Sequence, residues 1–443
     1  MAPLAPSGTS TLAERTGIDL LRFAAIGSVD DGKSTLIGRL LVDTRQLFDD
    51  QLEAVGAASR RRGGTEMDLA FVTDGLRSER EQGITIDVAY RYAATATRKF
   101  VIADCPGHVQ YTANMATGAS TADLGLVVVD VTAGLREQTR RHTCIAALLG
   151  VDQLVVAANK MDLVSWRQEP YEAVKAQMEA LARRLGIRSS AVVPVSALHG
   201  DNVVARSDAA PFYRGPSVLE ALESAPAGTW SALRDVGAGA GARLPVQWVL
   251  RHGNGRSYAG ILDGGPLSVG DDVIVLPGGH RTTVSALGTY DGPIREASVG
   301  LAVSVEVADD LDVGRGDLIA AASDPPTVTS NLGATVCWFG HRPLAVGDRF
   351  QVKHTTRVAP ARVTEIVARL DVHDLALVTT TGLDDNEIGV IRLSTGTPLA
   401  VDPYARSRVT GSFVLVDEAT NATLAAGMVG PPSLVPGHRE QAG

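Results

Sequence analysis

The sequence is poor in cysteine and lacks long apolar segments. Its three cysteines, Cys105, Cys144 and Cys337, lie far apart and form no C-x-x-C pair. A disulfide framework and a cysteine-ligated zinc site are therefore not expected, and a reducing cytosol fits this usage. No apolar stretch approaches the ~20 residues of a membrane span, and Met1 to Thr16 lacks the apolar core of a signal peptide. We expect a cytoplasmic protein with no membrane association.

Acidic residues outnumber basic ones, 50 to 41. The formal net charge is −9 and the pI is near 5.5, which argues against a broad basic surface for nucleic acid and leaves a local patch open. The nine histidines show no H-x-x-x-H pairing typical of zinc sites, and no Ser/His/Asp grouping is readable. A length of 443 residues predicts about two to four domains.

Apolar runs alternate with helical patterns in the first half of the chain. The predicted strands are Leu21–Ile26, Phe100–Ala103, Leu124–Val129, Gln153–Ala158 and Ala191–Val195. This alternation predicts a mostly parallel sheet covered on both faces, with binding sites beyond the carboxyl ends of its strands. Further along, short strands with Gly-rich turns replace the helices. Val-Gly-Asp occurs at 269–271 and again at 346–348, which suggests two similar β-barrels, although chance repetition is an alternative.

These changes in composition and periodicity along the chain predict six segments. They are a disordered N-terminus at 1–17, an α/β domain at 18–225, an Ala/Gly-rich linker at 226–243, β-barrels at 244–325 and 326–430, and a disordered tail at 431–443.

A phosphate-binding loop is predicted between the first strand and the helix that follows it. The pattern G-x-x-x-x-G-K-S is formed by Gly27, Ser28, Val29, Asp30, Asp31, Gly32, Lys33 and Ser34, and Thr35 follows it. Free N–H groups at a helix N-terminus attract phosphate. Lys33 is expected to reach the β- and γ-phosphates and the Ser34 hydroxyl to ligate Mg²⁺. A chance Gly-rich turn is the alternative, which the flanking strand and helix disfavour.

A second motif follows the next predicted strand. It consists of Asp104, Cys105, Pro106, Gly107 and His108. We expect Asp104 to hold Mg²⁺ through water, the Gly107 N–H to meet a γ-phosphate and His108 to orient an attacking water. If the motif stood alone, an ordinary Pro-Gly turn with an incidental histidine would be the better interpretation. Because the motif lies downstream of a phosphate loop, a catalytic role is favoured.

Two later segments predict a guanine pocket. They are Asn159, Lys160, Met161 and Asp162 after one strand and Ser196, Ala197 and Leu198 after the last. The Asp162 carboxylate can accept two hydrogen bonds from guanine, and adenine offers no such donor pair. We expect Asn159 to tie the base loop to the phosphate loop, Lys160 to lie along the ring and the Ala197 backbone to complete the pocket. A polar helix cap is the alternative for the first segment.

A charged loop, Glu79 to Asp87, lies between the phosphate loop and Asp104. A solvated loop can account for its first residues. Thr85, together with Ser34 and Asp104, is expected to complete the Mg²⁺ site and to sense the γ-phosphate, so that loss of this phosphate releases the loop.

The five elements in this order resemble the GTPases of the translation-factor class. Details resemble one branch, the large GTPase subunit of bacterial ATP sulfurylase. The runs that carry this likeness are Leu21–Leu41, Gln82–Tyr92, Asn114–Ser120, Gln138–His142, Thr410–Phe413 and Thr420–Thr423. Elongation factors typically place histidine where this chain has Ser28 and Asp31. The chain departs from the branch at Cys105 and Val109, where threonine and glutamate are usual.

The resemblance covers nearly the whole chain and implies a fold. This fold is an α/β P-loop GTPase domain, a mostly parallel sheet with helices on both faces, followed by two small antiparallel β-barrels. It implies GTP and Mg²⁺ as cofactors and Lys33, Gly107 and His108 as catalytic residues. GTP hydrolysis would drive the uphill formation of adenosine 5′-phosphosulfate and pyrophosphate from ATP and sulfate on a separate small adenylyltransferase subunit.

Other hypotheses remain open. No second phosphate loop occurs in the sequence, so the adenylylsulfate kinase fused to some relatives is not expected. An elongation-factor-like GTPase would use the same catalytic residues, but the acidic balance and the pair Ser28 and Asp31 disfavour it. A nucleotide-binding module without turnover would leave His108 idle. A monovalent cation at Asp30 is a further hypothesis.

Overall fold

The structure, a computed structural model, describes residues 19–46, 69, 85, 87–226, 240–252 and 255–431. Four predicted segments fall wholly or mostly outside the described residues: the N-terminus at 1–17, the charged loop at 79–87, the linker at 226–243 and the tail at 431–443. The chain divides into two compact units, Met1–Gly228 and Thr229–Gly443. In the described ranges no helix combines the length and the apolar character that crossing a membrane requires.

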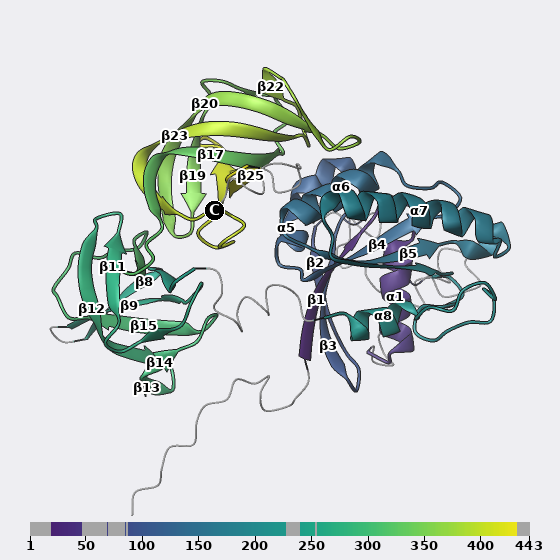
Figure 1. The fold of residues 1–443 in the computed structure, drawn as a ribbon, viewed down its shortest axis with the longest axis horizontal. Coiled ribbons are helices and arrows are strands. Elements are labelled where there is room, and N and C mark those ends of the chain that lie inside the picture. Colours follow the sequence, from purple (N-terminus) through teal and green to yellow (C-terminus); the bar gives the residue numbers. More distant parts are fainter. Residues whose placement is uncertain are drawn as a thin grey trace, which may run out of the picture. The chain divides into compact units, whose positions relative to one another are not determined.

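The first unit is built on a six-stranded sheet with the order β2-β3-β1-β4-β5-β6 (Figure 1). Its strands are β1 (Asp19–Ile26), β2 (Ala89–Ala94), β3 (Arg98–Asp104), β4 (Leu124–Asp130), β5 (Gln153–Asn159) and β6 (Ser189–Pro194). All are parallel except β2, which pairs antiparallel with β3. The five predicted strands are present with small differences at their ends. Strand β2 was not predicted, because its residues at this sheet edge alternate between half-buried and exposed and form no buried apolar run.

Helices cover both faces of this sheet. They are α1 (Lys33–Asp43), α5 (Thr112–Ser120), α6 (Glu137–Leu148), α7 (Gln168–Leu185) and α8 (Val218–Ser224), with short 3₁₀ turns η1 (Val109–Tyr111) and η2 (Met161–Val164). Helices α1 and α8 share one apolar core with the sheet, and α5, α6 and α7 lie on the other face (Figure 1). Every parallel strand therefore ends at the same edge of the sheet, where the predicted motifs begin.

The second unit contains two antiparallel barrels (Figure 1). The first consists of β7 (Arg243–Pro245), β8 (Trp248–His252), β9 (Gly255–Ile261), β10 (Leu267–Ser268), β11 (Asp272–Leu276), β12 (His280–Thr289), β13 (Gly292–Ile294), β14 (Glu296–Ala297), β15 (Ala302–Val307) and β16 (Leu318–Ala321). The second consists of β17 (Thr327–Trp338), β18 (Leu344–Ala345), β19 (Arg349–His354), β20 (Arg357–Asp371), β21 (Ala376–Val378), β22 (Gly382–Leu383), β23 (Ile388–Val401), β24 (Ser412–Val416) and β25 (Thr423–Val429). Its ladder closes through the pairing of β19 with β20. The predicted fold class is confirmed.

The two Val-Gly-Asp segments form the same turn in the two barrels. Gly270 and Gly347 have φ angles of 98° and 97°, a left-handed conformation that glycine adopts without strain. Their N–H groups donate to the carbonyls of Val284 and Val363, each over 2.9 Å. The repeated tripeptide therefore marks equivalent turns, each leading into a barrel strand.

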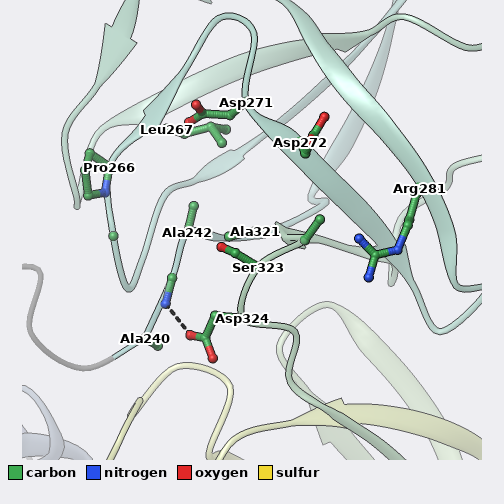
Figure 2. A pocket seen from close by; sticks show the side chains of 13 residues that line it. Ala240, Ala242, Pro266, Leu267, Asp271, Asp272, Arg281, Ala321, Ser323 and Asp324 are labelled. Atoms are coloured by element: carbon green, nitrogen blue, oxygen red, sulfur yellow. Dashed lines mark hydrogen bonds between the residues drawn. The ribbon is translucent and has the colours of Figure 1, made fainter.

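The barrels contact each other through a small apolar cluster and a buried ion network. The cluster consists of Ile274, Leu276, Leu318, Ala320 and Ala400. The network centres on Arg243, which is 0% exposed and binds Asp402, and it continues to Asp324. A cleft of about 740 Å³ opens beside Asp324 in the first barrel, with Arg281 among its lining residues (Figure 2).

Candidate functional site

The phosphate-loop sequence connects the end of β1 to the start of α1. Helix α1 begins at Lys33, and Gly32 precedes it with a φ of 93°. A Cβ atom at Gly32 would collide with the side-chain amide of Asn159, so both conformation and space require glycine here. The loop therefore presents its backbone at a helix N-terminus, the arrangement that attracts phosphate. In the same loop Ser28 and Asp31 are buried, Ser34 and Thr35 are half-buried, and Asp30 is exposed.

The Lys33 ammonium lies at the centre of the site. It is 7% exposed, and its Nζ donates to the carbonyls of Gly27 over 3.0 Å and of Ser28 over 2.8 Å. A Cβ on Gly107 would collide with this ammonium and lie 2.8 Å from the Gly27 carbonyl. The structure therefore brings the phosphate loop against the Asp104–His108 loop, at a distance that only glycine permits.

Charge is concentrated around this ammonium. Burial lowers the pKa of Lys33, and the negative charges of Asp104 and Asp31 oppose this shift. Asp104 ends β3 and is 1% exposed. Burial raises the pKa of the neighbouring Cys105 thiol, so that this residue is protonated at neutral pH and packs as an apolar group.

His108 follows Gly107 at the start of η1. Its Nδ1 accepts a hydrogen bond from the Gln110 N–H over 3.4 Å, and its ring lies 6.0 Å from that of Tyr111. The side chain is half-buried. His108 directly follows Gly107, which lies against the Lys33 ammonium, so its expected role in orienting a water stays a prediction.

Asn159 connects three loops. Its Nδ2 donates to the Asp31 carbonyl over 2.8 Å, and its Oδ1 accepts from the Ala197 N–H over 2.9 Å. The phosphate loop and the loop of Ser196, Ala197 and Leu198 are thereby held together through one side chain. Of these three residues, the first two are buried, and Leu198 is 50% exposed.

Lys160 adopts a left-handed conformation with a φ of 65°, which is uncommon for a residue with a side chain. Its Nζ binds the Asp130 carboxylate over 2.8 Å. Burial raises the pKa of Asp130, but hydrogen bonds from Lys160 and Thr132 outweigh this effect and hold it below its usual range. Asp162 lies in η2 and is half-buried, and its carboxylate accepts no hydrogen bond from the described residues. Its oxygens are thus available to a ligand.

Sequence reasoning missed Arg39 as part of this site. Its Nε donates to the Ala197 carbonyl over 3.3 Å, and its Nη2 donates to the Leu198 carbonyl. Arg39 lies on α1, 158 residues before Ala197, so no local pattern points to this contact. Its position on the helix that follows the phosphate loop is the only available signal.

The residues expected to hold Mg²⁺ are hard oxygen donors, the ligand type that this ion prefers. Ser34 opens α1 beside Lys33, and Asp104 lies close enough to affect the pKa of Lys33. Thr85 is half-buried, and its immediate neighbours lie outside the described residues. Across the described residues there is no cluster of three His, Cys, Asp or Glu side chains. A site completed by hydroxyl, water and phosphate oxygens fits this composition.

Acid is expected to destabilise the first unit through His142. This side chain on α6 is 0% exposed, and burial lowers its pKa from 6.5 to about 3, with Lys33 and Arg141 adding to the shift. Between about pH 3 and pH 6.5, His142 is protonated in the unfolded chain and neutral in the folded chain. Its effect on the free energy of unfolding is therefore absent above pH 6.5. As the pH falls, this free energy decreases, by about 2 kcal/mol at pH 5.

Urea unfolding of the full chain at pH 7 and pH 5, followed by circular dichroism at 222 nm, measures this loss. The helical signal reports the first unit, because every described helix lies there. We expect His142→Gln to remove about 2 kcal/mol of the pH-dependent loss. His199→Gln, at an exposed position, should behave as the unaltered chain. An equal loss in all three proteins would contradict the assignment.

Comparison with known proteins identifies relatives of both units. The family model for the elongation factor Tu GTP binding domain matches residues 19–227, and a model described as GTP-eEF1A C-terminal domain-like matches residues 331–430. Sulfate adenylyltransferase subunit 1 of Aeromonas hydrophila is 48% identical over 413 residues, which cover 93% of this chain and 86% of that protein. The bifunctional enzyme CysN/CysC of Mycobacterium tuberculosis is 51% identical over 93% of this chain and 67% of its own length. The bifunctional enzyme NodQ of Rhizobium sp. is 44% identical over 95% of this chain and 66% of its own length.

Proposed function

The chain belongs to the sulfate adenylyltransferase subunit 1 family, and we propose that it is the GTP-hydrolysing subunit of a heteromeric ATP sulfurylase. Hydrolysis of GTP on this chain drives formation of adenosine 5′-phosphosulfate and pyrophosphate from ATP and sulfate. The observation that carries the proposal is the meeting of Lys33, Gly107 and Asn159 around one loop at a helix N-terminus.

The phosphates of GTP occupy the loop from Gly27 to Ser34 in this proposal. The Lys33 ammonium exchanges its two backbone carbonyl acceptors for phosphate oxygens, and the backbone N–H groups of the loop and of Gly107 stabilise the charge that develops on the γ-phosphate. His108 orients the attacking water. His108 directly follows Gly107, which lies against Lys33, and its Nδ1 accepts a hydrogen bond from the Gln110 N–H over 3.4 Å.

Guanine is recognised by Asp162, whose carboxylate accepts from the base N1–H and the exocyclic amine. Asn159 and Arg39 hold the Ala197 segment from both of its backbone groups, so the pocket is preorganised before the base arrives. Lys160 is oriented by Asp130. Ser34, Thr85 and Asp104 would hold Mg²⁺, which when bound would supply positive charge to neutralise the β- and γ-phosphates.

The adenylyl transfer itself takes place on a separate small subunit. Every group assigned above in this chain serves GTP, and the relatives called sulfate adenylyltransferase subunit 1 are, by that name, one subunit of a larger enzyme. Formation of adenosine 5′-phosphosulfate is uphill, so coupling to a second hydrolysis makes the step favourable.

Reconstitution tests the proposal. The chain is purified with the partner that co-elutes from its own cytosol, and pyrophosphate release from ATP and sulfate is measured with and without GTP. We expect release to depend on GTP. Release that is indifferent to GTP, or retention of tRNA in place of a sulfurylase partner, would instead place the chain with the translational GTPases.

His108→Ala separates turnover from binding in the same assay. It should keep GTP affinity and slow GTP hydrolysis by about 10²-fold or more, with a parallel loss of GTP-dependent pyrophosphate release. His341→Ala, at an exposed site in the second barrel, serves as the control. An unchanged hydrolysis rate in His108→Ala would remove this residue from the mechanism.

A further inference from the structure

Helix α6 contacts the phosphate loop through a buried hydroxyl. Thr139 is 0% exposed, and its Oγ1 lies 2.8 Å from the Ser28 Oγ and 3.5 Å from Asp31 Oδ2. The phosphate loop and α6 are 111 residues apart at this contact. The run Gln138–His142 that contains Thr139 has no role in the reaction as described above.

The two residues that Thr139 contacts, Ser28 and Asp31, are also hydrogen-bonded to each other within the loop. Asp31 Oδ2 accepts from the Ser28 N–H over 2.8 Å, and the Asp31 N–H donates to the Ser28 carbonyl over 3.4 Å. The same Ser28 carbonyl accepts from the Lys33 ammonium. Arg136, also beside α6, donates to the Val29 carbonyl over 2.9 Å. The positions of the backbone groups that receive phosphate therefore depend on Ser28 and Asp31.

Removal of the Thr139 hydroxyl would leave two buried polar groups short of a partner. Ser28 is 4% exposed and Asp31 is 1% exposed, so water cannot replace the lost hydrogen bond without opening the loop. Asp31 Oδ1 already has no hydrogen-bond partner among the described residues and lies 3.8 Å from Arg136. The other hydrogen bonds of the turn hold its backbone and the Asp31 carboxylate, so the Thr139 hydroxyl is the partner that the Ser28 side chain has.

The preceding residue of α6 reaches the second loop of the site. Gln138 Nε2 donates to Thr112 Oγ1 over 3.4 Å, and Thr112 Oγ1 donates to the Val109 carbonyl over 2.7 Å, next to His108. This contact does not pass through Thr139. A change at Thr139 should therefore disturb the phosphate loop and leave the loop of His108 in place.

We propose that Thr139 is a positioning residue, whose hydroxyl holds the Ser28–Asp31 turn in the conformation that binds the phosphates of GTP. This inference rests on the proposed GTP site and adds to it a residue that never touches the nucleotide. Thr139 acts on GTP binding, because the contacts to the loop of His108 run through Gln138.

Paired substitutions in the full chain test the proposal. Thr139→Val keeps the shape of the side chain and removes the hydroxyl, and Thr139→Ser restores it. We expect Thr139→Val to raise the Kd for GTP about tenfold, while kcat at saturating GTP stays within about threefold. Thr139→Ser should bind within about twofold of the unaltered chain.

Thr143→Val provides a matched control. Thr143 is also 0% exposed on α6, but its hydroxyl donates to the Thr139 carbonyl over 2.7 Å and does not reach the phosphate loop. It should lose thermal stability as Thr139→Val does and retain GTP affinity. Equal GTP affinity in Thr139→Val and Thr143→Val would overturn the proposal, as would a loss confined to kcat.

Ser28→Ala removes the same contact from the loop side and keeps the test valid if Thr139→Val fails to fold. It should weaken GTP binding about tenfold, and the double variant should lose little more, since both changes remove one interaction. Unchanged affinity in Ser28→Ala would also overturn the proposal. If the unaltered chain does not bind GTP, the proposed function itself fails.

Discussion

Replacement of Asp162 with asparagine is expected to weaken GTP binding by about a thousandfold and to make xanthosine triphosphate the preferred nucleotide. Both hydrogen bonds to a charged acceptor are lost, each worth about 1.5–3 kcal/mol. The asparagine oxygen can still accept from the base N1–H, but its NH2 group faces the exocyclic amine of guanine, donor against donor. Xanthine carries a carbonyl where guanine has its exocyclic amine, so the amide N–H finds an acceptor there. A site built to pair with one hydrogen-bond pattern discriminates strongly against another.

Titration of both nucleotides against the variant measures this exchange. The carboxylate of Asp162 accepts no hydrogen bond from the described residues, so its loss should leave the rest of the site unchanged. Asp208→Asn makes the same chemical change at an exposed position of the same unit and should leave GTP affinity unaltered. Equal affinity of the Asp162 variant for GTP and for the xanthine nucleotide would refute the pocket assignment.

The motifs and strands that were predictable from the sequence are those whose residues act together with near neighbours along the chain. A phosphate loop, an aspartate at a strand end and an Asn-Lys-x-Asp segment each act through neighbouring residues, so their spacing along the chain carries the information. The predicted strands are apolar because they are buried on both faces. The fold class followed from these patterns together with the resemblance, and the family models and relatives support it.

Contacts between distant segments were not predictable in this way. The hydrogen bond of Arg39 to Ala197 and that of Thr139 to Ser28 join segments more than a hundred residues apart. Each depends on how a helix is rotated and placed on the sheet, which periodicity does not determine. Strand β2 was missed for a different reason, since half of its residues face outward. The roles assigned to His108, Thr85 and Asp162 stay predictions until they are measured.

Replacement of Arg243 with methionine is expected to destabilise the second unit by about 3–5 kcal/mol. Arg243 Nε and Nη2 donate to both oxygens of Asp402, over 2.9 and 3.1 Å, and Nη1 donates to the carbonyls of Gly241 and Ala242. Both partners of the ion pair are nearly inaccessible, at 0% and 1% exposed. Methionine would fill part of the volume and leave the buried Asp402 carboxylate without its paired hydrogen bonds from Arg243, with the Arg406 guanidinium 3.7 Å away.

An exposed pair in the second barrel provides the comparison. Arg392 lies 3.1 Å from Glu365, with the two side chains 68% and 54% exposed, so Arg392→Met should cost less than about 1 kcal/mol. Hydrogen exchange of the full chain in urea, read from peptides of β16 and β23, reports the second unit separately from the first.

If both arginine variants lose the same small amount of stability, the Asp402 carboxylate must have enough hydrogen bonds without Arg243. Thr410, which donates to Asp402 Oδ2 over 2.6 Å, and Arg406, 3.7 Å from Oδ1, would then be its main partners. A large loss confined to Arg243→Met would show that this ion pair holds the two barrels together, because a buried charge that loses its partner costs far more than an exposed one.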